Sequence, residues 1–272
     1  MCFKKRREII RGSKTALVTG ASTGIGRCYA QQLAGLGYNL ILVGLHEEAL
    51  NELAAELAAA EGVSVRVVVR DLATADAAHW LHGWVHEQGL AVDVLINNAG
   101  IFSFCDIVKT PVERIERTVL LHNMTVALMC RLFAADMTER GTGGHILNMS
   151  SFSIYMPFPG LSLYSASKAF IKSFSVAFSK EVSDCGIKVT AVCPAGIATD
   201  LYGLTKKWQK IGLKLGALST PEMCARRGLR ALWRGRRCIV PDWWNRIFIP
   251  FCLALPPFAM RWLRGVTMRF QK

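Results

Sequence analysis

The chain alternates short, nearly continuous apolar runs with longer stretches in which apolar residues recur every three or four positions. Short runs rich in Val, Ile and Leu are typical of strands buried on both faces of a parallel sheet. Seven such runs are present: TALVTG (15–20), NLILVGL (39–45), VRVVVRD (65–71), VDVLINN (92–98), HILNMSS (145–151), KVTAVCP (188–194) and RCIVP (237–241). We expect each of them to form a strand.

Helices are predicted between the strands. Residues 47–62 are rich in Ala, Leu and Glu and end on a glycine, residues 113–140 have helical length and spacing, and a further helix is expected over residues 164–185. Thr220 followed by Pro221 and Glu222 predicts a capped helix start. Alternation of strands and helices with right-handed crossovers predicts an α/β fold with a doubly wound, mostly parallel, seven-stranded Rossmann-type sheet. A chain of 272 residues with 51% hydrophobic residues suits one such domain.

The ends of the chain differ in charge from its body. Residues 1–14 carry six Lys/Arg and one acid, and residues 206–272 carry fifteen and two, whereas the stretch between has twelve and seventeen. No zinc-finger spacing, aromatic RNA-binding signature or basic zipper accompanies the net charge of +13, so nucleic acid is not an expected partner. An anionic membrane surface is the better candidate.

We therefore divide the chain into three parts. A basic segment (1–13) precedes a Rossmann-fold domain (14–242), whose residues 200–220 are expected to form a substrate loop. An amphipathic basic extension (243–272) follows. The basic start is not followed by an apolar run with a cleavage site, so no signal peptide is predicted.

Nine cysteines are present without a CxxC pair, and their number is odd. This favours buried thiols in a reduced compartment over a disulfide framework or a zinc site. We expect a cytoplasmic location and no metal.

Within the C-terminal extension, residues 247–260 are uncharged and contain three prolines. As a helix these fourteen residues would reach about 21 Å, against a bilayer core of about 30 Å. The segment is therefore interpreted as lying on a membrane surface, with contact through 243–264, and the rival interpretation is a contact between subunits. The flanking residues are Trp243, Trp244, Arg246, Arg261, Trp262 and Arg264.

Candidate chemistry begins with Tyr164 and Lys168, which are four residues apart and would share one helix face. A cation beside a phenol favours the phenolate and lowers the tyrosine pKa, which suits proton transfer near neutral pH. The alternative is a surface tyrosine beside a solvated lysine. After the first strand, TGASTGIGR places Gly20, Gly24 and Gly26 where a dinucleotide pyrophosphate binds at a helix start. A flexible strand–helix turn is the alternative.

Four motifs occur in order: TGxxxGxG, NNAG (97–100), SS (150–151) and YxxxK, with Ser151 thirteen residues before Tyr164. This set, over about residues 14–200, resembles the short-chain dehydrogenase/reductase family, and within it the hydroxysteroid dehydrogenases and 3-ketoacyl-CoA reductases. The resemblance implies an oxidoreductase that interconverts alcohol and carbonyl groups with a nicotinamide cofactor.

The resemblance also implies roles for four residues. Tyr164 would donate a proton to the carbonyl or accept one from the alcohol, and Lys168 would lower its pKa and hold the nicotinamide ribose. Ser151 would hydrogen-bond the reacting oxygen. Asn123 would orient a water and the lysine, with an ordinary polar helix position as the alternative.

Further residues are implied to bind the cofactor, with Asp71 near the adenine and Thr199 at the carboxamide. The full set is Gly20, Ser22, Thr23, Gly24, Ile25, Gly26, Asp71, Asn97, Ala99, Gly100, Tyr164, Lys168, Pro194, Ile197 and Thr199.

Two positions depart from the family pattern. Ala195 replaces the usual glycine after Pro194, which predicts a shifted loop unless Gly196 absorbs the turn. Gly44 stands where members that prefer NAD usually carry an acid, and the next residue is not the arginine common in NADP-preferring members. Arg27 or His46 could hold a 2′-phosphate, so NADP(H) is favoured over NAD(H).

Between Ser151 and Tyr164, the segment FSIYMPFPGLSL (152–163) has many aromatics and few polar residues. If it borders the nicotinamide, the substrate is small and hydrophobic, such as a steroid or fatty-acyl ketone or alcohol; the alternative is that these side chains pack under the loop. The sequence thus predicts a homo-oligomeric oxidoreductase, peripheral to a membrane. The alternatives are a dinucleotide-binding regulator with little turnover and an enzyme acting on a non-lipid carbonyl compound.

Overall fold

The predicted strands form one parallel sheet. The computed structural model describes residues 13–156, 158–198, 205–214, 218–242, 245–254, 256 and 258–259. Within them the strand order is β3-β2-β1-β4-β5-β6-β7, and every neighbouring pair is parallel. The strands are β1 (Thr15–Thr19), β2 (Asn39–Gly44), β3 (Val65–Val69), β4 (Val94–Asn97), β5 (Gly144–Met149), β6 (Ile187–Val192) and β7 (Cys238–Ile239).

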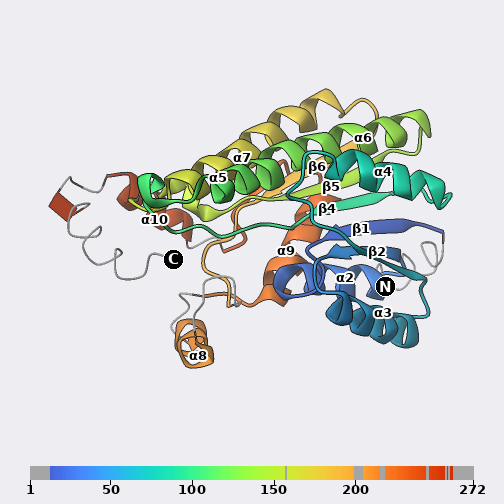
Figure 1. Cartoon of the computed structure of the whole chain (residues 1–272), viewed down its shortest axis with the longest axis horizontal. Helices are drawn as coiled ribbons and strands as arrows, with labels where there is room; N and C mark the ends of the chain where they lie inside the picture. Colours follow the sequence, from blue (N-terminus) through green and yellow to red (C-terminus); the bar gives the residue numbers. More distant parts are fainter. Residues whose placement is uncertain are drawn as a thin grey trace.

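Helices cover both faces of the sheet (Figure 1). On one face lie α2 (Gly24–Gly35), α3 (Glu47–Glu61) and α9 (Pro221–Trp233); on the other lie α4 (Ala77–Glu87), α5 (Val112–Val119), α6 (Val126–Glu139) and α7 (Ser162–Glu181). Two further helices, α8 (Lys206–Lys214) and α10 (Asn245–Leu253), lie away from the sheet, and the short turns are η1 (Ile107–Lys109), η2 (Leu120–Thr125) and η3 (Phe152–Tyr155). The predicted doubly wound architecture is confirmed.

The two-sided core explains why the strands read as continuous apolar runs. In β1, Ala16 and Val18 belong to the core under α2, α3 and α9, whereas Leu17 belongs to the core under α4, α6 and α7. All three side chains are fully buried. Successive residues of a strand point to opposite faces, so both sets must be apolar when both faces are covered.

Helix ends follow the sequence signals closely, with one exception. Gly62 ends α3 in the left-handed conformation (φ 64°), and the Thr220 hydroxyl accepts a hydrogen bond from the Met223 amide at 3.2 Å to cap α9. The single helix expected over residues 113–140 is instead interrupted by η2, which is a π-helical turn. A π turn adds one residue to the helical repeat and is frequent at functional sites.

Among the described residues, one continuous helical segment, Val112–Glu139, is long and apolar enough to cross a membrane by length and composition alone. Half of its most apolar part is buried inside the domain, as in a core helix. Its apolar character is therefore explained by packing against α4, α7 and the sheet.

Candidate functional site

The chain reverses the strand order between β1 and β4, and ligands bind at the carboxyl ends of the strands beside such a switch point. The predicted glycine loop lies here, between β1 and α2. Gly20 and Gly24 have positive φ angles of 63° and 56°, which L side chains rarely adopt. A Cβ on Gly26 would lie 2.0 Å from the Gly20 carbonyl oxygen. The glycines are therefore required by the backbone, and the loop is not a flexible linker.

A hydrogen-bond network joins this loop to the NNAG motif. The Thr19 hydroxyl accepts from the backbone amides of Asn98 and Ala99 at 2.9 and 3.0 Å, and the Asn98 side-chain amide donates to the carbonyl oxygens of Thr19 and Gly20. A Cβ on Gly20 would also come within 2.9 Å of the Ala99 Cα atom. The two motifs thus form one rigid cradle after β1 and β4.

The residues of the predicted catalytic set come together beside this cradle. Ser151 is the second residue after β5, while Tyr164 and Lys168 occupy the first turns of α7, and all three are buried. The Lys168 ammonium donates to the Met149 carbonyl oxygen at 3.0 Å and lies 5.8 Å from the centroid of the Tyr164 ring. The alternative of a surface tyrosine beside a solvated lysine is therefore wrong.

Burial dominates the protonation of this pair. It raises the pKa of Tyr164 to about 12, against a smaller opposing effect of the hydrogen bond with Ser151, and it lowers the pKa of Lys168 to about 7. The predicted lowering of the tyrosine pKa by the lysine is not met in this structure. The reason is that burial disfavours the charged forms of both groups, including the ammonium that was expected to stabilise the phenolate.

Asn123 lies in the π-helical turn η2, and its side-chain oxygen is buried without a hydrogen-bond partner among the described atoms. A buried acceptor of this kind is costly unless something outside the protein satisfies it, by about 1–3 kcal/mol. This orphan oxygen is what an ordered water or bound ligand would complete.

His122 was missed by the sequence analysis. It is fully buried, its Nε2 accepts from the Ile101 amide at 2.9 Å, and its Nδ1 lies 2.8 Å from the Ser167 hydroxyl. Because Nε2 is an acceptor, Nδ1 carries the proton and donates to Ser167, which in turn donates to the Tyr164 carbonyl oxygen at 2.8 Å. Burial and the nearby Lys168 lower the pKa of His122 well below its usual value, so the ring is neutral.

The other predicted cofactor residues differ in what their side chains do. Asp71 accepts from the Ala73 amide and pairs with Arg117 at 2.8 Å; these interactions outweigh partial burial and lower its pKa. The Asn97 side chain is buried and donates to Asn148 at 2.8 Å, so its amide is used within the protein.

At the end of β6, the Pro194 carbonyl oxygen accepts from Phe152 at 2.8 Å, and Ile197 is buried and bridges to Ser219. Ser22 is buried, Ile25 is partly exposed, and Thr23 and Gly100 are exposed. Thr199 lies outside the described residues.

The loop at Ala195 has an ordinary backbone. Neither Ala195 nor Gly196 has a positive φ, so neither position requires a glycine in this structure. A shift of this loop relative to the family's usual path stays a prediction.

One of the two cations suggested for a 2′-phosphate, Arg27, already has an acidic partner. Arg27 forms an ion pair with Glu56 at 2.6 Å. His46 is exposed at the start of α3 and is the freer of the two.

Aromatic side chains next to Tyr164 come from an unexpected segment. Phe102, which follows the NNAG motif, lies 5.0 Å from Tyr164 edge to face and is stacked on Phe104 at 6.4 Å between ring centroids. Phe152 and Tyr155 of the segment after Ser151 pack instead with residues of β7 and α10. For these two the alternative of packing under the loop holds.

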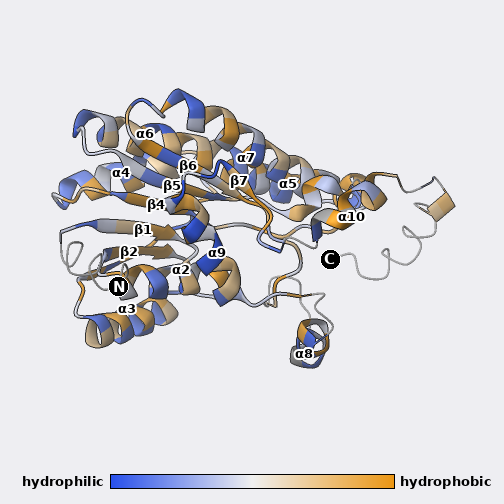
Figure 2. Cartoon of the chain, turned by 180° about the vertical axis from the view of Figure 1, so that it is seen from behind, coloured by the Kyte–Doolittle hydropathy of each residue, from blue (hydrophilic) through white to orange (hydrophobic). Residues whose placement is uncertain are grey.

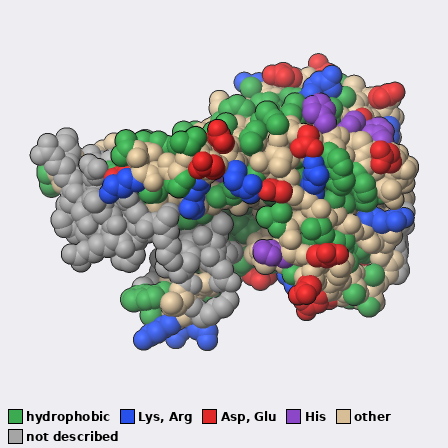
Figure 3. All heavy atoms as spheres, viewed as in Figure 1, with side chains coloured by type: hydrophobic (Ala, Val, Ile, Leu, Met, Phe, Trp, Pro, Cys, Tyr) green, Lys and Arg blue, Asp and Glu red, His purple; other side chains and the backbone are tan. Residues whose placement is uncertain are grey.

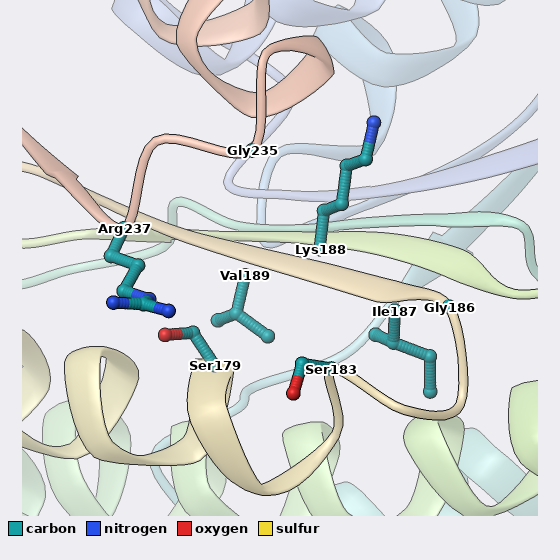
Figure 4. A pocket seen from close by; sticks show the side chains of 8 residues that line it. All are labelled: Ser179, Ser183, Gly186, Ile187, Lys188, Val189, Gly235 and Arg237. Carbon is teal, nitrogen blue, oxygen red and sulfur yellow. The ribbon is translucent and has the colours of Figure 1, made fainter.

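A further pocket lies at the opposite edge of the sheet (Figure 4). It is lined by Ser179, Ser183, Gly186, Ile187, Lys188, Val189, Gly235 and Arg237, where α7 ends and β6 begins. Because the cradle lies at the carboxyl ends of the strands, this pocket is not part of the candidate site.

The fold and the site together define a dinucleotide-binding oxidoreductase. A glycine cradle at a switch point fits a pyrophosphate, and a buried Ser–Tyr–Lys set with an orphan asparagine oxygen fits a nicotinamide and a reacting oxygen. The family model for short chain dehydrogenases matches residues 14–210, and the chain belongs to this family.

Similar proteins include named reductases and dehydrogenases. The chain is 36% identical to the very-long-chain 3-oxoacyl-CoA reductase of Anas platyrhynchos, over 70% of this chain and 62% of that protein. It is 34% identical to the 17-beta-hydroxysteroid dehydrogenase type 3 of Danio rerio, over 71% and 64%. The short-chain dehydrogenase from Sphingobium yanoikuyae in complex with NADPH superposes with a TM-score of 0.75 and 29% identity, over 86% and 91%. The chain spans 33% to 64% of the length of the first curated relatives that it matches.

Proposed function

We propose that the chain is an oxidoreductase that transfers a hydride between a nicotinamide cofactor and a hydrophobic alcohol or ketone, with Tyr164 as the acid/base. The observation that carries the proposal is the convergence of Ser151, Tyr164 and Lys168 beside the glycine cradle. The nicotinamide, when bound, supplies or accepts the hydride.

The protein's own groups handle the proton. With a pKa of about 12, Tyr164 is protonated at neutral pH and suited to donate to a carbonyl oxygen that gains charge. Ser151 donates a second hydrogen bond to that oxygen. Lys168, with a pKa of about 7, can gain or lose a proton at the same pH and can therefore replace the proton that the tyrosine gives up. The unpartnered oxygen of Asn123 would accept a hydrogen bond from a water that carries protons to Lys168.

NADP(H) remains our favoured cofactor. β2 ends on Gly44, where an acid would repel a 2′-phosphate, and His46 is exposed nearby. A similar solved structure is an NADPH complex.

The substrate is proposed to be lipid-like. Phe102 and Phe104 offer an apolar wall next to Tyr164 and provide no groups for a sugar or an acid. Relatives named for steroid and long-chain acyl substrates are consistent with this chemistry.

We also propose that the Rossmann domain (14–242) meets a membrane through the C-terminal extension (243–272). Helix α10 shows hydrophobic colour along much of its length (Figure 2), and Ile247, Phe251 and Leu253 are more than half exposed. Its nine residues are too short to span a bilayer, but an exposed apolar helix beside basic residues suits an interface. Phe170, 38% exposed and stacked on Phe174 in α7, is a candidate contact for a homo-oligomer.

Nicotinamide absorbance during incubation with a panel of steroid and fatty ketones tests the activity. NADPH and NADH are compared in parallel, with Tyr164→Phe as the control. We expect wild-type turnover with NADPH and a loss of at least a hundredfold in the variant, because the ring remains but the proton donor is gone. Cofactor binding without turnover on any ketone or alcohol would instead support the dinucleotide-binding regulator.

A further inference from the structure

Three side chains that no step of the proposed reaction uses meet on the surface of the domain. His82 and His86 lie one turn apart on α4, and Asp136 lies near the end of α6. Because α6 ends where the chain turns into β5, this place is at the amino-terminal edge of the sheet, opposite the glycine cradle. In Figure 3 histidine side chains gather on the surface where α4 lies in Figure 1.

The three groups form a nearly equilateral triangle of ligand atoms. The Nε2 atoms of His82 and His86 are 3.1 Å apart, and each is 3.0 Å from the same Asp136 oxygen, Oδ2. Hydrogen bonding alone explains this poorly. If both rings donate to Asp136, two N–H groups face each other across 3.1 Å, and if one ring accepts, it turns a lone pair toward the carboxylate.

We propose that His82, His86 and Asp136 bind a divalent transition-metal ion of the zinc type. In tetrahedral zinc sites with metal–ligand bonds of about 2.0–2.1 Å, neighbouring ligand atoms lie about 3.3 Å apart. The observed triangle needs to expand by only about 0.3 Å on each side to accept the ion. Its three ligands would leave the fourth position for water.

The surroundings hold the ligands in place. The His82 ring packs edge to face on Phe133, a fully buried residue of α6, with 5.2 Å between ring centroids. The side chains of His82 and Asp136 are about one-fifth exposed, whereas that of His86 is 56% exposed. The site is thus built on two packed helices and remains open to solvent on one side.

The ligand set selects the class of ion. Two imidazoles and one carboxylate suit Zn²⁺, Co²⁺, Ni²⁺ or Cu²⁺, whereas Mg²⁺ and Ca²⁺ prefer oxygen ligands alone. Because the site is far from the cradle, the ion would fasten α4 to α6 and take no part in hydride transfer. Metal bound only by the folded state stabilises it.

The test is titration of the full-length, metal-stripped protein with Co²⁺ and with Zn²⁺. The wild type is compared with two single variants, His86→Ala and Asp136→Asn. We expect one Co²⁺ per chain with the visible absorption of a tetrahedral site, and a rise in Tm of about 5 °C at a hundredfold excess of Zn²⁺ over its Kd. Each variant should lose at least tenfold in affinity. His79→Ala is the matched control, because His79 is an exposed histidine of the same helix outside the triangle.

Equal metal binding in wild type and His86→Ala would overturn the proposal. So would the absence of binding by the wild type at about 100 µM metal, because the dissociation constant would then exceed that concentration. Charge-transfer absorption of a cobalt–thiolate bond that survives in the variants would assign the metal to cysteines instead. Since His86 is largely exposed, its alanine variant should fold normally, which circular dichroism checks.

Discussion

At the scale of single residues, burial controls the chemistry of the site. Tyr164 and Lys168 lie in the same low-dielectric environment, and each is pushed toward its neutral form. For the tyrosine this keeps the phenol protonated at neutral pH, and for the lysine it brings proton exchange into the neutral range. The same burial has a consequence for stability that can be measured without substrate.

Lys168 should make the stability of the domain depend on pH. Its pKa is about 7 in the folded state against an ordinary value of 10.5, so between these values the unfolded chain binds more protons, and stability rises with pH. Replacing it with Met removes this dependence. Between pH 6.5 and 10 we expect the free energy of unfolding of wild type to gain about 3–4 kcal/mol relative to Lys168→Met.

Urea unfolding at several pH values checks this, with Lys172→Met as the control. Lys172 lies one turn further along α7, and its pKa is raised, the hydrogen bond and attraction of Tyr155 outweighing its partial burial. Lys172→Met should therefore keep the wild-type rise of stability with pH. A parallel pH profile for wild type and Lys168→Met would contradict burial as the cause.

At the scale of elements, the π-helical turn η2 connects three parts of the site. It presents His122 to the loop after β4 and to α7, and it leaves the Asn123 oxygen without a partner. A π turn has more residues per turn than an α-helix, so adjacent side chains such as His122 and Asn123 are separated by less than the roughly 100° of a regular helix. The interruption therefore favours an arrangement in which both side chains face the site.

His122→Phe should destabilise the domain by about 1–3 kcal/mol, because the ring is replaced by one of similar size while the Ile101 amide and the Ser167 hydroxyl lose a partner. Thermal and urea unfolding measure this. The matched control is His79→Phe, at an exposed position of α4, which should change stability by less than about 0.5 kcal/mol. Equal effects of the two substitutions would show that the His122 hydrogen bonds contribute nothing.

For the whole molecule, charge and exposed apolar side chains are unevenly distributed along the chain. The body of the chain is mildly acidic, the basic excess lies at the two ends, and exposed apolar side chains occur on α10. A peripheral enzyme for a lipid-like substrate needs both features near the surface that it docks to.

The double variant Phe251→Glu, Leu253→Glu should bind vesicles containing phosphatidylserine at least tenfold more weakly than wild type in a sedimentation assay, because two apolar contacts become negative charges. Both side chains are exposed, at 67% and 60%, so the fold should tolerate the change. The control is Val108→Glu, an exposed residue outside the extension. Unchanged vesicle binding would rule out α10 as the docking element and favour the contact between subunits.

The seven strands, the helix start at Thr220 and the ordered motifs could all be predicted from the amino-acid sequence. These signals are local, because a two-sided apolar run, a cap or a glycine in a tight turn depends on a few neighbouring residues. The same local character allowed Ser151, Tyr164 and Lys168 to be placed in one site through their motif spacing.

The surroundings of those residues depend on tertiary packing and could not be predicted from the sequence. The burial that sets the pKa of Tyr164, the place of Phe102 beside it, the bridging by His122 and the meeting of Asp136 with two histidines of another helix all join segments far apart in the chain. No local pattern encodes such contacts, since they arise when helices pack on a common sheet. Solvation and long-range proximity are properties of the folded whole.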